Sequence, residues 1–367
     1  MLPGLYVHIP FCRSKCPYCG FYSIPSSTPM DGWFDGLKRE VIYQKSLFGR
    51  FDSLYLGGGT PTFLNTKLLE QVMASLLDHF HLTANAEITI EANPCDITRS
   101  KADALKALGF NRINLGVQSF NDNVLKFLGR RHSSENAEKA VGHLRSAGFK
   151  NIGLDLIYGL KAQSMREWID TLRRALSFQP EHLSCYQLTL EKGTVFNRRS
   201  HKNNMFTLPE KTAAAHFLAT SSFLENKGYV HYEVSNFARS EHLASRHNQK
   251  YWNHTPYLGL GPSAHSFDGK KRWWNVRSLK KYRSALKEGR LPIEGWETLT
   301  KEQLHLESLA LGFRTRRGVD PESLDATSEK ALAMFQKQGL LKIVDGRAVP
   351  TRRGYLLADH LPLCFSS

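Results

Sequence analysis

The sequence predicts an α/β protein, an open, partial parallel β/α barrel followed by a small C-terminal domain that resembles a winged helix. Three observations predict this fold. Short β-branched segments alternate with amphipathic helical segments in the first two-thirds of the chain, polar or glycine-rich clusters follow the expected strands, and residues 300–367 change to a helical pattern with a hairpin. Six strand–helix units are too few for the usual closed eight-stranded barrel, so we expect an open one.

The expected strands alternate with the expected helices, which predicts parallel strands joined by right-handed crossovers. The strands are expected at 5–9, 53–56, 87–91, 112–118, 152–157 and 182–188. The helices are expected at about 31–48, 66–79, 98–107, 134–147 and 164–177. Thr98 and Ser164 are typical helix N-caps, and Gly109 and Gly148 are typical of the position just after a helix.

These patterns divide the chain into three parts. Residues 1–240 form the barrel, residues 241–299 form a connecting segment rich in histidine and aromatic residues, and residues 300–367 form the C-terminal domain. In the last part, helices are expected at 302–311 and 328–337, before a hairpin that turns at Asp345-Gly346.

The composition is that of an ordinary globular protein, with 41% hydrophobic and 23% charged residues among 367. No segment reaches the roughly 18 apolar residues of a membrane span, and the first residues lack a signal-peptide pattern, so we expect a cytoplasmic protein. The net charge of +15 suits nucleic acid, anionic lipid or a carboxylate-bearing ligand such as a porphyrin. No nucleic-acid-binding signature accompanies that charge.

Three cysteines, Cys12, Cys16 and Cys19, have the spacing C-x3-C-x2-C just after the first expected strand. Three thiolates can hold three irons of a four-iron cluster and leave the fourth iron open. A disulfide framework is disfavoured by the short spacing. A zinc site with His8 as fourth ligand is disfavoured by the extended Ile9-Pro10, and a redox pair is disfavoured by the third cysteine.

The glycine-rich segment 57–61 follows the second expected strand. An open iron beside backbone that can approach an anionic group closely indicates S-adenosylmethionine (SAM) and radical chemistry. Further polar residues lie at successive strand ends, where parallel sheets carry their chemistry. The candidate roles are Gly58 and Gly59 for the methionyl group, Glu91 for an ammonium, Asp155 for ribose hydroxyls, Arg130 for a carboxylate and Tyr18 for the adenine.

Residues 246–275 are rich in histidine, tyrosine and tryptophan, which suits a large, flat aromatic ligand. His247 is the candidate axial ligand of a haem iron, and Tyr251 and Trp252 offer apolar faces beside it. Arg246 and Lys250 offer cations for the haem propionates. The alternative is an aromatic mini-core that ties the barrel to the next domain.

Several of these motifs together resemble the radical SAM family of oxygen-independent coproporphyrinogen III oxidase-like proteins, over nearly the whole chain. They are 6–12 with the later cysteines, 57–62, 116–120, 155–160 and 228–237. The resemblance implies a [4Fe-4S] cluster on Cys12, Cys16 and Cys19. It also implies SAM at Tyr6, Gly58, Gly59, Thr60, Glu91, Gln118, Arg130 and Asp155, with the number of bound SAM molecules left open.

Within that family the chain is most similar to the HemW-like haem chaperone branch. Phe21 stands where the dehydrogenases usually carry a further cysteine, few residues precede Cys12, and 247–252 matches the motif H-N-x-x-Y-W. The resemblance therefore implies a haem-binding chaperone that handles or transfers haem. The partners it implies are haem or porphyrin, a reducing electron donor, and haem-accepting proteins or a membrane surface.

Two other activities stay open. One is an oxygen-independent coproporphyrinogen III dehydrogenase, which decarboxylates propionates oxidatively through a 5′-deoxyadenosyl radical. The other is a radical SAM methyltransferase or RNA-modifying enzyme, which only the positive charge suggests.

Overall fold

The computed structural model describes residues 1–25, 30–161, 163–200, 206–324 and 328–365. Its main feature is a run of parallel strands, each hydrogen-bonded to the next. In chain order and in sheet order these strands are β1 (Gly4–Ile9), β4 (Phe51–Gly58), β5 (Leu82–Ala92), β6 (Arg112–Gln118), β7 (Ile152–Tyr158) and β8 (His182–Gln187). The predicted parallel sheet is confirmed.

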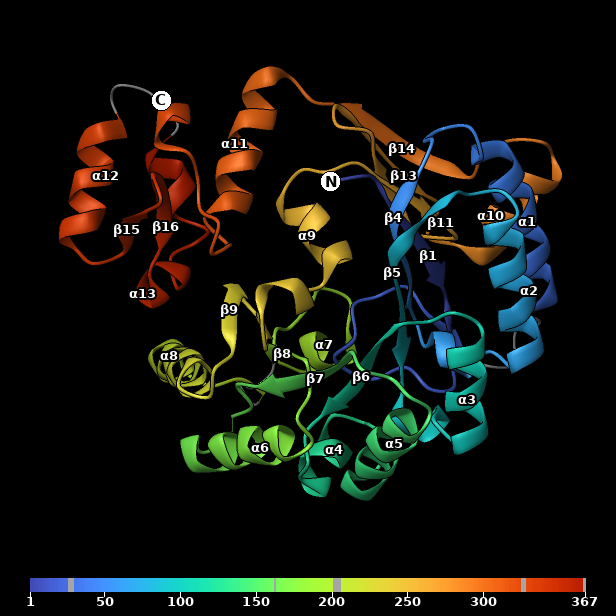
Figure 1. The fold of residues 1–367 in the computed structure, drawn as a ribbon, viewed down its shortest axis with the longest axis horizontal. Helices are drawn as coiled ribbons and strands as arrows, with labels where there is room; N and C mark the ends of the chain where they lie inside the picture. Colours follow the sequence, from blue (N-terminus) through green and yellow to red (C-terminus); the bar gives the residue numbers. More distant parts are fainter. Residues whose placement is uncertain (26–29, 162, 201–205, 325–327, 366–367) are drawn as a thin grey trace.

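Helices cover the outer face of this sheet, as Figure 1 shows. The predicted ones are α1 (Asp31–Gln44), α2 (Thr66–Leu77), α3 (Arg99–Ala107), α5 (Ser134–Ser146) and α6 (Met165–Ser177). The structure adds α4 (Asp122–Phe127), α7 (Val195–Ser200) and α8 (Glu210–Glu225). Thr98 and Ser164 are N-caps as predicted, and Gly109 and Gly148 follow their helices with φ of 88° and 84°.

Alternation along the strands separates the core from the inner face of the barrel. In β1, Leu5, Val7 and Ile9 are fully buried in the hydrophobic core shared with the helices. Tyr6 and His8, between them, point to the opposite, concave face of the sheet. Polar side chains are therefore directed into the barrel, where a ligand can meet them.

Residues 241–299 do not form the separate connecting segment that the sequence predicted. They supply α9 (Arg246–Trp252), β11 (Tyr257–Leu260), β12 (His265–Phe267), β13 (Lys271–Asn275), α10 (Leu279–Lys287) and β14 (Ile293–Thr298). β11 pairs in parallel with β1, and β12, β13 and β14 extend the sheet by antiparallel pairing. Short strands that pair only with distant residues carry too little local signal to be recognised in the sequence.

The opposite edge of the sheet is extended by β10 (Asn236–Ala238) and β9 (Val230–Glu233), both antiparallel. The complete sheet has twelve strands in the order β14-β13-β12-β11-β1-β4-β5-β6-β7-β8-β10-β9. No pairing joins β14 to β9 among the described residues, so the barrel is open as predicted.

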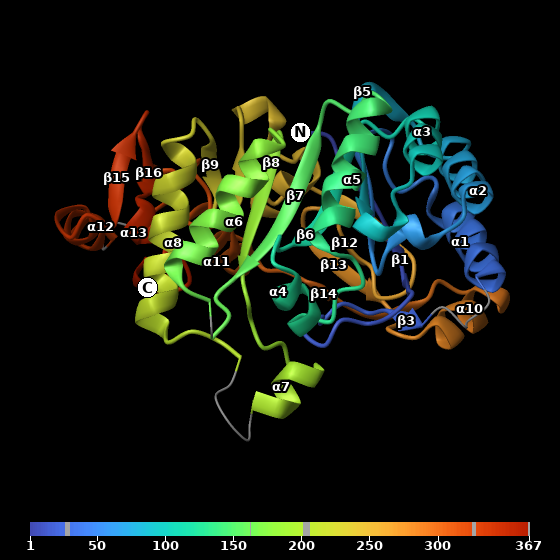
Figure 2. The ribbon, with the colours of Figure 1, turned by 90° about the horizontal axis from the view of Figure 1, so that it is seen from below.

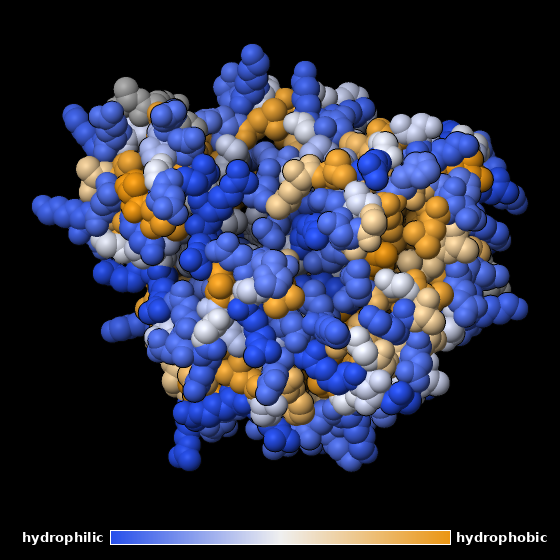
Figure 3. Space-filling model, in the orientation of Figure 1, coloured by the Kyte–Doolittle hydropathy of each residue, from blue (hydrophilic) through white to orange (hydrophobic). Residues whose placement is uncertain are grey.

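The C-terminal part has a hydrophobic core of its own, which includes Phe313, Phe335 and Phe365. Its elements are α11 (Lys301–Gly312), α12 (Ser328–Lys337), β15 (Leu341–Val344), β16 (Arg347–Pro350) and α13 (Arg352–Tyr355). The predicted hairpin is confirmed, because β15 pairs with β16 and both Asp345 and Gly346 have positive φ. The C-terminal part stands beside the barrel in Figure 1, and Figure 3 shows a hydrophobic patch over α12 and β15.

Candidate cofactor site at the open end of the barrel

The cysteine loop and the glycine loop lie side by side at the carboxyl ends of β1 and β4. Their backbones are joined where Gly59 N donates to Ile9 O at 2.8 Å and Thr60 N donates to Phe11 O at 2.8 Å. The Thr60 hydroxyl lies 3.4 Å from Cys12 Sγ. The chain around Cys12 forms the short strand β2 (Phe11–Cys12), paired with β3 (Ile24–Pro25). Figure 2 places β3, α4 and α7 on the same side of the molecule.

Two glycines of the loop have no room for a side chain. Gly58 has a φ of 111°, and a Cβ there would lie 2.6 Å from the His8 ring. A Cβ on Gly59 would lie 2.6 Å from Phe11 O. The glycines therefore let the backbone pass close to β1 and leave the loop bare on its open side.

The three cysteines are partly buried free thiols that interact electrostatically with one another. Burial raises the pKa of Cys12 and of Cys19, with smaller effects from the neighbouring cysteines. Arg130 Nη1 lies 3.6 Å from Cys16 Sγ. A bound iron centre would favour thiolates at all three positions.

The geometry disfavours the zinc alternative. Among the described residues, no three His, Cys, Asp or Glu side chains are placed to hold a single metal ion. Both ring nitrogens of His8 already have partners, Tyr22 O at 2.8 Å and Tyr6 OH at 3.1 Å. Cysteines that each bind a separate iron of a cluster need not converge on one point.

Arg130 and Gln118 converge over Gly116, at the carboxyl end of β6. A Cβ on Gly116 would lie 3.0 Å from Gln118 Nε2 and 3.1 Å from Arg130 Nη2. Arg130 Nη2 donates to Gly116 O at 2.6 Å, whereas its buried Nε has no hydrogen-bond partner in the described part of the chain. Gln118 has a φ of 65° and sits in a tight turn closed by Ser119 N and Val117 O at 2.8 Å. Such turns are strained and concentrate at functional sites.

Glu91 and Asp155 are half-buried carboxyl groups on the inner face of the barrel. Glu91 accepts hydrogen bonds from Tyr55 OH at 2.9 Å and from Gly58 N at 3.1 Å. Burial, and next the charge of Asp155, raises the pKa of Glu91 to about 7. Burial raises the pKa of Asp155 to about 6, although Ser184, Arg112 and Arg130 lower it. Neither carboxylate has a lysine or arginine hydrogen-bonded to it among the described residues.

These residues fit a zwitterionic, cationic ligand such as SAM. The two half-buried carboxyl groups favour a positive group, and Arg130 Nε, which has no hydrogen-bond partner among the described residues, favours an anionic one. The bare glycine backbone lies next to Glu91, because Gly58 N is one of its donors. The chemistry of these groups thus suits the ammonium and carboxylate of one amino acid moiety beside the cysteines.

Tyr6 and Tyr18 have different surroundings. Tyr6 lies deeper in the barrel, with ring centroids 6.1 Å from Tyr55 and 6.2 Å from His247. Tyr18 interacts electrostatically with Arg130, and its ring packs 6.4 Å from Phe196 of α7. Both therefore border the group of candidate residues. Tyr6 lies towards the amino ends of the strands, near His247, and Tyr18 lies beside Arg130.

The side chains that surround Glu91 and Asp155 are not predictable from the local sequence motifs. Tyr55 OH donates to Glu91, Asn114 Nδ2 donates to Tyr55 OH at 3.2 Å, and Ser184 lowers the pKa of Asp155. The sequence of β6 indicates which residues point into the barrel, because polar or glycine positions alternate with apolar positions that point outward. The inward residues are Arg112, Asn114, Gly116 and Gln118, and the outward ones are Ile113, Leu115 and Val117.

His247 is not brought to the cysteines, contrary to what a shared haem and cofactor site would need. It lies in α9, at the amino ends of β1 and β4, with Nδ1 3.0 Å from Ser53 Oγ and Nε2 3.0 Å from Tyr251 OH. Burial lowers its pKa to about 3. Since both ring nitrogens are engaged and the side chain is buried, His247 as folded does not present a free nitrogen to a haem iron.

The cations predicted to hold the propionates are engaged as well. Lys250 is fully buried, pairs with Asp52 and donates to Leu2 O at 2.7 Å. Arg246 donates to Asp52 O at 3.2 Å and to Asn85 O at 2.9 Å. Tyr251 packs edge-on to Tyr257, and Trp252 is half-buried. The aromatic mini-core, kept open as the alternative, describes this segment better.

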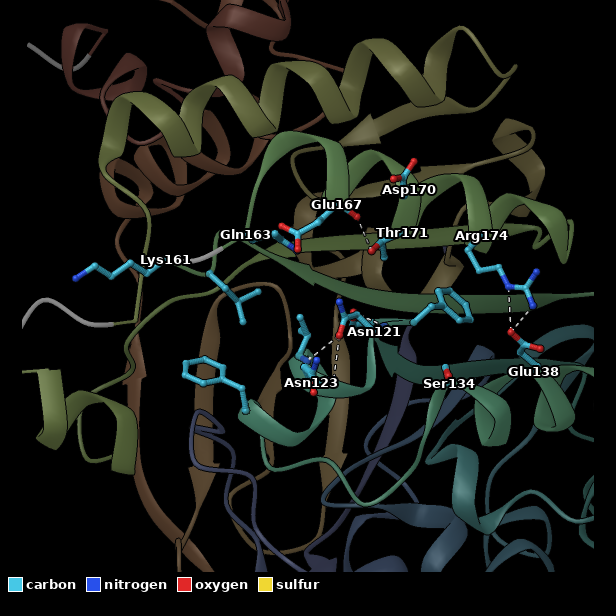
Figure 4. Close-up of a pocket in the computed structure, with 15 residues that line it drawn as sticks. Asn121, Asn123, Ser134, Glu138, Lys161, Gln163, Glu167, Asp170, Thr171 and Arg174 are labelled. Carbon is cyan, nitrogen blue, oxygen red and sulfur yellow. Dashed lines mark hydrogen bonds and ion pairs between the residues drawn. The ribbon is translucent and has the colours of Figure 1, made fainter.

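A cavity of about 970 Å³ lies outside the barrel, between α4 and α5 on one side and α6 on the other (Figure 4). Ser119 and Phe120, just after Gln118, border it, and an ion pair of Arg174 with Glu138 spans one end. None of the predicted cofactor residues lines it. The cavity and the cofactor site are therefore separate.

Comparison with known proteins agrees with this geometry. The family model of the radical SAM superfamily matches residues 6–175, and that of the HemN C-terminal domain matches residues 299–357. The chain is 33% identical to "Heme chaperone HemW" of Bacillus subtilis (strain 168), over 98% of both chains. It is 34% identical to "Radical S-adenosyl methionine domain-containing protein 1, mitochondrial" of Mus musculus, over 97% of this chain and 82% of that one.

A solved structure is similar as well. The radical SAM coproporphyrinogen III oxidase HemN of Escherichia coli matches with a TM-score of 0.85 and 28% identity, over 100% of this chain and 90% of that chain. The match extends over the barrel, the antiparallel extension and the C-terminal part.

Proposed function

We propose that this chain, which belongs to the HemW family of radical SAM proteins, is a haem-binding chaperone with a [4Fe-4S] cluster and SAM. The support for the haem role is similarity over nearly the full length to proteins named heme chaperones. The support for the cofactors is the radical SAM match together with the cysteines, the bare glycines and Arg130 Nε, which has no hydrogen-bond partner among the described residues.

The observation that carries the cofactor part is the position of Arg130. Its guanidinium lies against Cys16 on one side and Gly116 on the other, and its Nε lacks a partner among the described residues. A half-buried guanidinium whose buried Nε–H is unused beside the cysteines suits the carboxylate of a ligand held next to the cluster.

The remaining residues have roles that follow from their chemistry. Cys12, Cys16 and Cys19 would hold the cluster, and Thr60 would donate to the sulfur of Cys12. The residues proposed to hold SAM are Tyr6, Tyr18, Gly58, Gly59, Thr60, Glu91, Gln118, Arg130 and Asp155. When bound, the cluster and SAM supply one-electron reduction and a carbon-centred radical. The chain itself orients the ligand's charged ends and leaves the glycine loop open to it.

A second function is favoured by one observation, the similarity in structure to coproporphyrinogen III oxidase HemN. A coproporphyrinogen III dehydrogenase would use the same cluster and SAM site. Phe21, at the position where that branch usually has a further cysteine, is an exposed apolar side chain. That difference is why we rank the chaperone first.

The partners follow from the same proposal. A cluster that must be reduced needs an electron donor, and a chaperone needs a protein or membrane surface that accepts haem. No helix in the part of the chain that the structure describes is both long and apolar enough to cross a bilayer. Placement in the cytoplasm stays a prediction from the sequence.

The test is a pair of assays on anaerobically reconstituted protein. We expect a saturable Soret band on addition of haem, and no conversion of coproporphyrinogen III to protoporphyrinogen IX under conditions where SAM is cleaved. Robust decarboxylation without haem binding would contradict the chaperone and favour the dehydrogenase.

A further inference from the structure

A groove of about 630 Å³ lies between α1 and α10, and most of its charged side chains are basic. Figure 2 shows these two helices together at one end of the molecule, with β3 beside them. The basic side chains in the lining are all exposed, and none has an ion pair within the described residues; they are Arg39, Lys280, Arg283 and Lys287. Among the described residues of the lining the one carboxylate is Asp35, which already pairs with Lys38 at 2.9 Å. The groove therefore offers four positive charges to an anionic partner.

The groove is built into the packing of α10 on α1. Two glycines one turn apart on α1 let α10 come close, because a Cβ on Gly32 would overlap the guanidinium of Arg283 and a Cβ on Gly36 would lie 2.8 Å from Tyr282 Cε1. The Tyr282 hydroxyl donates at 2.6 Å to Glu40, a buried carboxyl group of α1. The two helices therefore form a fixed pair, and the groove between them is part of the fold.

The groove adjoins the cysteine loop through residues that follow Cys19. Ile24 of β3 lines the groove and is the register partner of Phe11 in β2. The next residue, Pro25, is the register partner of Cys12. Because neighbouring strands of a sheet lie about 5 Å apart, the wall of the groove at Ile24 is one strand away from the strand that contains Cys12.

Two hydrogen bonds fix the same loop to the start of α10. Leu279 N donates to Tyr22 OH at 2.8 Å, and Arg277 Nη2 donates to Gly20 O at 2.5 Å. Tyr22 also lines the groove, and its carbonyl oxygen lies 2.8 Å from His8 Nε2 at the end of β1. A molecule seated in the groove would therefore contact the segment of chain that continues directly from the cysteines.

We propose that this groove is the docking surface of a small acidic protein that carries single electrons, and that the carrier reduces the cluster from there. The inference rests on the proposed function, because a chain without a cluster would not need this reductant. In each encounter the carrier is oxidised by one electron and the cluster is reduced by one, and no covalent bond forms or breaks. Complementary charge speeds the association of such partners, and electron-transfer complexes need only a small interface.

An anionic membrane surface is the other partner that four clustered cations could attract. The concave shape favours a protein, because side chains on a convex protein surface can enter a groove, whereas a flat bilayer meets only its rims. The position one strand away from Cys12 favours an electron carrier among acidic proteins, because a reductant acts only if it comes close to the cluster.

The first test measures binding of an acidic plant-type [2Fe–2S] ferredoxin to the reconstituted full chain by calorimetry at low ionic strength. In the variant with both Lys280→Glu and Lys287→Glu, we expect the dissociation constant to rise at least about tenfold. Added salt should weaken the binding of wild type more than that of this variant. The control variant, Lys330→Glu with Lys337→Glu, makes the same change of net charge on α12, at the opposite end of the molecule (Figure 1), and should bind like wild type.

The second test follows reduction of the cluster by electron paramagnetic resonance. Reduction by the ferredoxin should be at least about tenfold slower in the variant of Lys280 and Lys287 than in wild type. Dithionite is a small reductant that needs no docking surface, so it should reduce the cluster of this variant at the wild-type rate. Both lysines are exposed, and the melting temperature of the variant should equal that of wild type.

The outcomes separate this inference from the proposed function. If wild type holds no cluster that dithionite can reduce, the proposed function fails and this inference fails with it. If wild type has such a cluster but does not bind the ferredoxin, or binds it no more tightly than the variant of Lys280 and Lys287 does, only the inference is overturned. Weaker binding of that variant to phosphatidylglycerol vesicles, with unchanged binding to the ferredoxin, would assign the groove to a membrane instead.

Discussion

The two ends of the barrel carry similar polar residues that differ in their hydrogen-bond and ion-pair partners. At the amino end, α9 fills the barrel, and the polar side chains of His247 and Lys250 are matched by Ser53, Tyr251 and Asp52. Glu87 of β5 accepts from the first backbone N–H groups of α9, which anchors the helix there.

At the carboxyl end, some comparable polar groups lack partners among the described residues. Arg130 Nε has no partner in the described chain, and burial holds the pKa values of Glu91 and Asp155 at about 7 and about 6. The comparison teaches that residue type did not distinguish structural from functional polar groups in this barrel. The hydrogen bonds and ion pairs of α9 differ from those of the cofactor residues, although Arg112 at the amino end of β6 also has two buried nitrogens, Nε and Nη2, without hydrogen-bond partners among the described residues.

The largest expected effect that distinguishes the carboxyl end of the barrel from the amino end comes from substitution of a cysteine. Cys16→Ala should reduce iron from about four per chain to a small residue and abolish SAM cleavage, because one iron of the cluster loses its ligand. Iron analysis and anaerobic absorbance measure this. Cys95→Ala is the matched control and should keep the cluster, since the Cys95 thiol lies 3.9 Å from Asn136 Oδ1 and belongs to no cysteine motif. Full iron content in Cys16→Ala would refute the assignment.

Substitutions at the amino end of the barrel should change the stability of the fold instead of cofactor binding. Asp52→Ala leaves the fully buried Lys250 without its counter-charge and should lower the free energy of unfolding by about 3 kcal/mol. Urea denaturation measures this. Asp35→Ala breaks an exposed ion pair with Lys38 and should cost less than about 1 kcal/mol. Equal effects of the two substitutions would mean that Lys250 is not held as the structure has it.

Two glutamates whose pKa values are raised to about 7 offer a matched test of the comparison. Glu91→Gln should raise the dissociation constant for SAM about tenfold to a hundredfold, the value of one charge-assisted hydrogen bond. Glu40 has the same pKa of about 7, but it accepts from Gly261 N, Asn275 Nδ2 and Tyr282 OH and so joins α1 to the antiparallel strands.

Glu40→Gln should therefore lower the melting temperature and leave the affinity for SAM unchanged. Equilibrium dialysis and calorimetry distinguish the two effects. A weaker affinity for SAM in Glu40→Gln, at full stability, would show that the two carboxyl groups do not have separate roles.

The smallest expected effect is a pH dependence of SAM binding. A cationic ligand favours the ionised form of Glu91, whose pKa is about 7 in the free protein, so protons compete with the ligand as the pH falls. Between pH 7 and pH 5.5 the dissociation constant should rise, by at most about tenfold per pH unit for one proton. The rise should be smaller in Glu91→Gln. An unchanged slope in that variant would assign the proton to another group, such as Asp155.

The sequence by itself determined the parallel strands, the covering helices, the caps at Thr98 and Ser164, and the hairpin at Asp345-Gly346, because each depends on neighbours in the chain. It also indicated the chemistry at the strand ends, since C-x3-C-x2-C and the glycine loop are local motifs. The side-by-side position of those two loops followed from the rule for parallel sheets and is confirmed by the Gly59 to Ile9 hydrogen bond.

Only the tertiary structure decided what the histidines and charges do. His247 belongs to a suggestive motif, yet Ser53 takes one of its ring nitrogens from far away in the sequence. The segment 241–299 likewise became part of the sheet through pairing of β11 with β1. Whether a polar side chain is satisfied or open depends on such distant partners, which no local pattern encodes.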